Sequence, residues 1–234
     1  MRGVWREYCR LVSPRLMEAS SSNEDSELYR REALGAFAHE VRTPLTSIKM
    51  VMELARRQSN DDELRLDSEL VEMLQTSVDD LQHLADDLQE TSRMERGRVV
   101  LGNGPCELQA AVEAARDLVP QLELSGDTVA IEGPWDAPRL VRAIAGFTEA
   151  ANRIGDGSGM VRLEVDRAPA FVSLTFTSGS PGGESRGIAA DAGFSFFRSR
   201  QLVLAMGGSL HCDRAERFAT FTVALPLDRN GARL

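Results

Sequence analysis

The chain has 234 residues, with 36 acidic and 27 basic side chains and a formal net charge of −9. An acidic balance without a basic block argues against nucleic-acid binding. No apolar run is long enough for a transmembrane helix, so we expect a cytoplasmic protein with one large or two modest domains. Neither a disulfide framework nor a structural metal site is predicted, because the cysteines and histidines are scattered: Cys9, Cys106, Cys212, His39, His83 and His211.

Residues 1–23 are expected to form a leader that ends in a polar, helix-capping segment. Two stretches with apolar residues at four- and three-residue intervals follow, separated by a polar turn at 58–62. The pattern predicts an antiparallel helical hairpin over residues 24–97. One hairpin cannot cover both stripes, which favours a dimeric four-helix bundle over packing against the rest of the same chain. The two predicted seams are Leu34, Ala38, Val41, Leu45, Ile48, Met52 and Ala55, and Val71, Leu74, Val78, Leu81, Ala85 and Leu88.

Residues 98–234 have a different pattern, in which amphipathic segments precede alternating ones. Helices are predicted at 105–125, 136–153 and 199–206. Strands are predicted at 160–165, 171–176, 209–212 and 219–225. Helices combined with mostly antiparallel strands predict an α+β two-layer sandwich.

The first predicted helix carries His39 beside its seam, directed towards solvent. Arg42 and Thr43 share the His39 face, three and four residues later. Pro44 cannot donate to the carbonyl of Glu40, so a bend is expected after His39. Neutral imidazole is a nucleophile at physiological pH, and Glu40 can orient the ring or take up a proton. Thr43 can place a hydroxyl near an attacking water. This combination suits a histidine that accepts and passes on a phosphoryl group.

The run at 37–48, Phe-Ala-His-Glu-Val-Arg-Thr-Pro-Leu-Thr-Ser-Ile, resembles the H-box of two-component sensor histidine kinases. The return helix, ending at 92–97, resembles the second helix of that family. The resemblance implies that His39 is the phosphoacceptor, that Glu40 assists phosphorylation and that Thr43 assists dephosphorylation of a response regulator. Arg42 and Pro44 would support the site. It also implies a homodimer, receiver domains as partners and an ATP-binding type of fold after the hairpin.

In the resembled family, an asparagine helix holds Mg²⁺ and an aspartate binds the adenine amine. Here Gly146 and Ala150 stand at the asparagine positions, and neither can coordinate a metal. Asn152 would point to another side of the helix. Thr177 stands at the place of the aspartate.

The family's glycine-rich phosphate turn corresponds to residues 191–196. It keeps Gly193 but lacks the two flanking glycines, and Asp191 adds a negative charge. The glycines at 182–183 and 155–159 are weak candidates for a phosphate-binding loop, because glycine clusters mostly mark turns. The closing helix and strand nevertheless resemble the family. We therefore predict a degenerate kinase-like domain that binds no ATP.

These observations favour a histidine phosphotransferase that exchanges a phosphoryl group between His39 and receiver aspartates. Such a protein needs no cofactor of its own, because the receiver domain would supply Mg²⁺. Three alternatives stay open: a divergent ATP-dependent autokinase, a response-regulator phosphatase that uses Glu40 and Thr43, and a non-catalytic adaptor that binds a regulator. His83, on the second helix, is expected to be solvated or packed.

Overall fold

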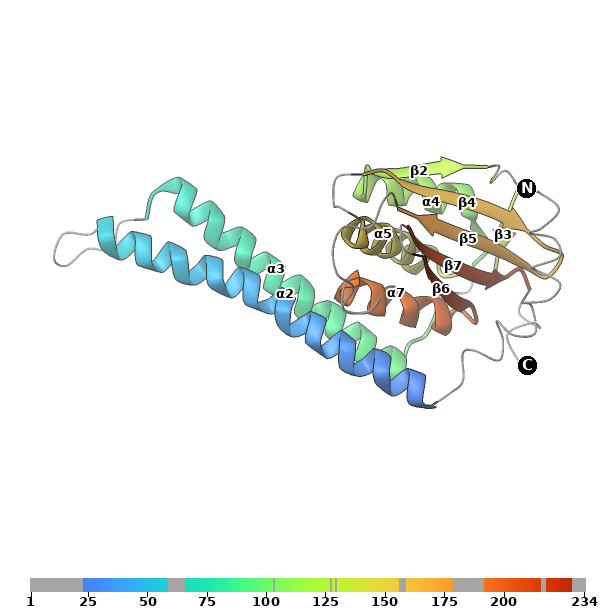
Figure 1. Ribbon diagram of the computed structural model, residues 1–234, viewed down its shortest axis with the longest axis horizontal. Helices are drawn as coiled ribbons and strands as arrows, with labels where there is room; N and C mark the ends of the chain where they lie inside the picture. Colours follow the sequence, from blue (N-terminus) through green and yellow to red (C-terminus); the bar gives the residue numbers. More distant parts are fainter. Residues whose placement is uncertain are drawn as a thin grey trace.

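The computed structural model describes residues 23–58, 66–102, 104–126, 128, 130–155, 159–178, 192–215 and 218–228. Most of the predicted leader, residues 59–62 of the predicted turn, the glycines at 157 and 182–183, and Asp191 lie outside the described residues. The described chain forms a long helical hairpin followed by an α+β unit (Figure 1).

The hairpin consists of α2 (Asn23–Gln58) and α3 (Ser68–Glu95). Asp67 caps α3 by accepting a hydrogen bond from the Leu70 N–H at 2.8 Å. Arg30 and Glu95 form an ion pair at 3.2 Å, which ties the start of α2 to the end of α3. The predicted hairpin is confirmed. Charged side chains interrupt every helix, and within the described residues none is long and apolar enough to cross a membrane.

The side chains that join α2 to α3 differ from the predicted seams. Ala33 packs against Phe194 and Phe197 of the C-terminal unit, and Met94 belongs to the core of that unit. The buried residues of the hairpin include several small side chains: Ala33, Ala36, Val51 and Ala55 on α2, and Leu70, Ser77, Thr91 and Met94 on α3. Leu34, Leu45 and Val78 from the predicted seams are 56%, 50% and 51% exposed. The apolar surface of each helix is therefore wider than one neighbour covers, and much of the predicted seam faces outward.

The C-terminal unit is a two-layer sandwich in which three helices cover one face of a five-stranded sheet (Figure 1). The sheet order is β2-β4-β5-β7-β6, with β2 parallel to β4 and all other pairs antiparallel. The helices are α4 (Leu108–Leu118), α5 (Ala137–Ile154) and α7 (Phe194–Ala205). The strands are β2 (Leu122–Ser125), β4 (Val161–Arg167), β5 (Phe171–Thr177), β6 (Ser209–Ala215) and β7 (Phe218–Pro226). A small second sheet pairs β1 (Cys106–Glu107) with β3 (Glu132–Gly133). The predicted α+β sandwich is confirmed.

Two predicted helices have other boundaries in the structure. The helix predicted over 105–125 is only α4, because Leu122–Ser125 pairs with β4 as an edge strand, and Leu118 is 61% exposed. Helix α7 begins at Phe194, five residues before the predicted start, because Phe194, Phe196 and Phe197 are all buried. Burial of the aromatic side chains thus extends the helix towards its N-terminus.

The core between the layers contains an aromatic cluster in which Phe147 contacts Phe176, Phe196 and Phe221 at centroid distances of 5.5, 5.9 and 6.2 Å. Phe147 projects from α5, Phe196 from α7 and the other two from the sheet. This cluster fixes α5 and α7 against the sheet and against each other. Both α5 and the N-terminal half of α7 contact the hairpin.

Candidate functional site

His39, Arg42 and Thr43 are exposed on α2, as expected for one solvent-facing surface of a helix. The helix is α-helical throughout, with Pro44 inside it and buried. Next to the site, the Thr46 hydroxyl donates to the Arg42 carbonyl at 2.8 Å. The predicted site residues therefore lie together on one helix, with the imidazole open to solvent.

Glu40 differs from its neighbours because it contacts the C-terminal unit. Its Oε1 accepts a hydrogen bond from the backbone N–H of Phe194 at 3.2 Å. The same oxygen forms an ion pair with the Arg153 guanidinium. Arg153 lies in the last turn of α5, and Phe194 is the first residue of α7. The Glu40 side chain is 19% exposed, so most of the carboxylate is covered.

Gly193 makes the approach of Glu40 to α7 possible. It precedes α7 with φ = 83°, a conformation that L side chains rarely adopt. A Cβ added there would collide with the Arg153 guanidinium and with Oε1 of Glu40. The glycine expected to cradle phosphate thus lies against a carboxylate of the same chain.

Carboxylates of α3 form a second set of contacts with arginines of the C-terminal unit. Arg142 contacts Asp87 and Glu90 at 2.6 Å each, and Arg139 contacts Glu90 at 3.3 Å. Asp87 also pairs with Arg198 of α7. The C-terminal part of α3 is therefore docked on α5 and α7, whereas the sequence pattern favoured dimerisation over packing within the chain.

Apolar packing accompanies these ion pairs. The rings of Phe37 and Phe194 meet edge to face, with centroids 5.2 Å apart. Phe194 and Phe197 are buried together with Ala33 of α2, and Leu88 of α3 packs against them. Helix α7 thus packs against both helices of the hairpin (Figure 1).

Glu149 stands within the same group of charges. Burial of its carboxyl raises the pKa of Glu149 above its ordinary value, although Arg198 and Arg153 act in the opposite direction. Glu40 and Asp87 raise the pKa of Glu149 further. The carboxylates of Glu40, Asp87 and Glu149 therefore lie close enough to repel one another. The arginines at 153 and 198 offset this repulsion.

The two positions at which the family would carry asparagine are closed by packing. A Cβ added to Gly146 would collide with Oγ of Ser199 and approach the Ser195 carbonyl oxygen to 3.1 Å. The Ala150 side chain is fully buried, with 0% exposure. Asparagine at Gly146 would require α5 and α7 to separate, and asparagine at Ala150 would need space in the packed core, so the residues present do not fit an asparagine-held metal.

Two further expectations concern the nucleotide site. Thr177 ends β5, where it pairs with Arg162 and Thr220, and it brings no carboxylate to that place. The part of the chain that the structure describes contains no group of three or more His, Cys, Asp or Glu side chains that could hold a metal ion. The absence of a cofactor stays a prediction, because residues 179–191 lie outside this part.

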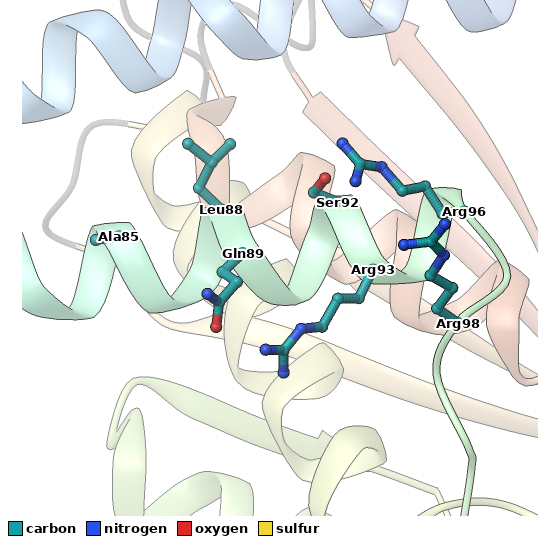
Figure 2. A pocket seen from close by; sticks show the side chains of 7 residues that line it. All are labelled: Ala85, Leu88, Gln89, Ser92, Arg93, Arg96 and Arg98. Atoms are coloured by element: carbon teal, nitrogen blue, oxygen red, sulfur yellow. The ribbon is translucent and has the colours of Figure 1, made fainter.

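A groove of about 620 Å³ lies at the C-terminal end of α3 (Figure 2). Ala85 and Ser92 in its lining follow Val71 and Val78 at seven-residue intervals, so the groove lies at the end of the outward-facing stripe of α3. The lining residues are Ala85, Leu88, Gln89, Ser92, Arg93, Arg96 and Arg98.

Comparisons with known proteins agree with this fold and hairpin. Residues 29–97 match the His Kinase A (phospho-acceptor) domain. The chain is 27% identical over 175 residues to the signal transduction histidine-protein kinase BaeS of Escherichia coli, covering 70% of this chain and 36% of BaeS. It is 27% identical over 236 residues to the probable sensor histidine kinase TcrY of Mycobacterium tuberculosis, covering 90% of this chain and 48% of TcrY. The chain thus spans about a third to a half of these relatives.

Solved structures show the same architecture. The Acinetobacter baumannii histidine kinase AdeS aligns with a TM-score of 0.65 and 18% identity, over 81% of this chain and 98% of AdeS. Histidine kinase ThkA, in complex with response regulator protein TrrA, aligns with a TM-score of 0.55 and 17% identity over 87% of this chain and 66% of ThkA. The chain therefore carries a His Kinase A (phospho-acceptor) domain at residues 29–97 and is similar in sequence and in fold to histidine kinases.

Proposed function

We propose that this protein is a histidine phosphotransferase, which carries a phosphoryl group on His39 and exchanges it with the aspartates of response-regulator receiver domains without binding ATP. The observation that carries the proposal is the closure of the α5–α7 interface. Gly146 and Ala150, the positions for metal-binding asparagines, are both buried, and Gly146 lies directly against Ser199 of α7. A phosphoryl group must then come from another protein.

The transfer needs few groups from this chain. A ring nitrogen of His39 attacks the phosphorus of a receiver aspartyl phosphate. An N–P bond forms, the acyl-phosphate P–O bond breaks, and the aspartate carboxylate leaves. The reverse reaction loads a second receiver. Exposure of His39 on α2 supports this role, since a receiver must reach the ring. The receiver domain supplies Mg²⁺.

The neighbouring residues have supporting roles in this proposal. Glu40 orients the imidazole when it is free to do so. Thr43, one turn away and exposed, places its hydroxyl near the phosphoryl group. Arg42 offers a positive charge on the same face, and Pro44 shapes the helix after the site. A cytosolic location stays a prediction.

The acting form in this proposal is a homodimer. The outward-facing apolar residues of both helices give a second chain a surface to cover, and burial of such side chains drives association. They include Leu34, Leu45, Met52, Val71 and Val78. The groove at the end of α3 continues this surface, so the partner hairpin would cover part of it (Figure 2).

An ATP-dependent autokinase is the second candidate. It is favoured by the names of the relatives BaeS and TcrY, which describe a histidine-protein kinase and a probable sensor histidine kinase. For this chain to phosphorylate itself, ATP would have to bind without the asparagine positions on α5. Labelling with radioactive Mg-ATP tests this candidate directly.

The proposal is tested by mixing the full chain with a receiver domain that carries a radiolabelled phosphoryl group, in the absence of nucleotide. The wild type should take up label, and His39→Ala should take up none. Release of inorganic phosphate that is lost in Thr43→Ala, without label on the protein, would instead establish a phosphatase. Retention of the receiver without either reaction would establish an adaptor.

A further inference from the structure

We infer that the C-terminal unit contains an anion-binding site that the chain fills with its own Glu40. The site consists of the Arg153 guanidinium, the N–H of Phe194 and the backbone of Gly193, which lies against the Glu40 carboxylate. We call it the Glu40 site. While Glu40 is bound there, the acid beside His39 is held away from the reaction, so the docked chain is a resting state. This inference rests on the proposed role of His39.

The Glu40 site has the chemistry of a site for anions. Helix α7 has 12 residues, and its first N–H groups have no partner within the helix. The aligned peptide dipoles make this end of the helix attractive to negative charge. Arg153 adds a full positive charge beside it. Gly193 leaves room for an oxygen that any other residue would exclude.

A ligand occupies this site in the structure, and it is a side chain of the hairpin. Oε1 of Glu40 accepts from both the Phe194 N–H and the Arg153 guanidinium. The bound group is a carboxylate, so the N-terminal end of α7 and Arg153 together hold an anion although Gly193 has no glycine on either side.

Occupancy of the site has a consequence for His39. Oε1 of Glu40 accepts from two donors of the C-terminal unit, one of them charged, and these contacts hold the carboxylate towards α7. Movement of the N-terminal end of α7 away from α2 would separate the carboxylate from the Phe194 N–H. The contact of Phe37 with Phe194 and the pair of Asp87 with Arg198 hold α7 against the hairpin. Undocking therefore frees Glu40, and docking withdraws it.

Hydrogen exchange at the Phe194 amide measures occupancy of the site without any phosphoryl donor. This amide is the first of α7, so its protection comes from Glu40 rather than from the helix. We expect several-fold faster exchange at Phe194 in Arg153→Gln and in Gly193→Ala, and partial restoration of protection in Arg153→Lys. Arg162→Gln, at an exposed position on β4, is the matched control and should exchange like wild type. Unchanged exchange in both variants would overturn the inference.

The effect on His39 is measured with phosphoramidate, which transfers its phosphoryl group to imidazole as its P–N bond breaks and ammonia leaves. Arg153→Gln and Gly193→Ala should be phosphorylated several-fold faster than wild type and Arg162→Gln. Unfolding curves of each variant check that the fold is kept. Faster exchange at Phe194 with an unchanged phosphorylation rate would overturn the resting-state claim. If even wild-type His39 accepts no phosphoryl group, the proposed function fails, while the exchange result still decides whether the Glu40 site exists.

Discussion

Asp136 joins helix α5 to the segment that connects the hairpin with the C-terminal unit. Its carboxylate accepts from the Gly102 N–H at 2.7 Å and from the Arg139 N–H at 3.2 Å, and it pairs with the Arg139 guanidinium. Burial acts to raise the pKa of Asp136, but these hydrogen bonds outweigh it, and the pKa lies below its ordinary value. The ionised form is therefore stabilised by folding.

Replacement of this carboxylate by an amide should weaken the fold. We expect Asp136→Asn to lower the free energy of unfolding by about 1–2 kcal/mol at neutral pH, through loss of the cap and of the charged pair. Because folding lowers the pKa, this stabilisation is present above the ordinary value of 3.8 and is lost as the pH falls through the lower, folded-state value. Urea unfolding at neutral and acidic pH measures it. Asp166→Asn, at an exposed position, is the control, and an equal loss in both variants would contradict the account.

Gly146 is the residue on which close contact between α5 and α7 depends. A Cβ there would collide with Oγ of Ser199, so Gly146→Ala should destabilise the protein by about 1–3 kcal/mol through overpacking. Ser199→Ala removes the oxygen and should reduce that cost when the two changes are combined. Urea unfolding of the single and double variants tests this. Equal costs in the two backgrounds would mean that Ser199 does not limit the approach.

At the scale of elements, α2 and α3 each have two apolar surfaces, and the described hairpin uses one of them. The periodicity of the sequence predicted both helices, because regular spacing over many turns is a strong signal. It did not distinguish the surface that joins the two helices from the surface that faces outward. Both surfaces obey the same spacing, and small residues such as Ala36 and Ala55 are buried, whereas the larger Leu34 is exposed.

A charge on the outward surface tests its role. Val78→Lys places an ammonium group in the centre of the α3 stripe, where the proposed dimer would bury it at high cost. We expect a monomer by size-exclusion chromatography with light scattering. Gln82→Lys adds the same charge at an exposed position outside the stripe and should leave the dimer intact. A dimeric Val78→Lys protein would place the interface elsewhere.

At the scale of the whole molecule, the carboxylates of α3 hold the hairpin against the C-terminal unit. Asp87 pairs with Arg142 and with Arg198, whose side chain is only 13% exposed. Removing the charge leaves Arg198 partly buried without its counter-ion, so Asp87→Asn should lower the free energy of unfolding by about 1–3 kcal/mol. Asp86→Asn, at an exposed neighbouring position, serves as the control in urea unfolding. Equal stability of the two variants would mean that the pairs of Asp87 contribute nothing to docking.

The sequence predicted the two-part fold and the solvent exposure of His39, Arg42 and Thr43 on one helix, because these depend on local patterns. It did not predict the contact between Glu40 and Arg153, which are 113 residues apart and meet only when the two units dock. Gly193 was a signal for this contact, since a glycine kept in a degenerate turn indicates that another group approaches the backbone closely. The sequence could not show that the approaching group belongs to the same chain.

The central claim is that His39 receives its phosphoryl group from another protein, and one labelling experiment tests it most directly. The full chain and His39→Ala are incubated either with a receiver domain carrying a radiolabelled phosphoryl group or with radiolabelled Mg-ATP alone. The account predicts label on the wild type from the receiver only, and none on His39→Ala. Label on His39 from Mg-ATP alone would contradict it and establish an autokinase.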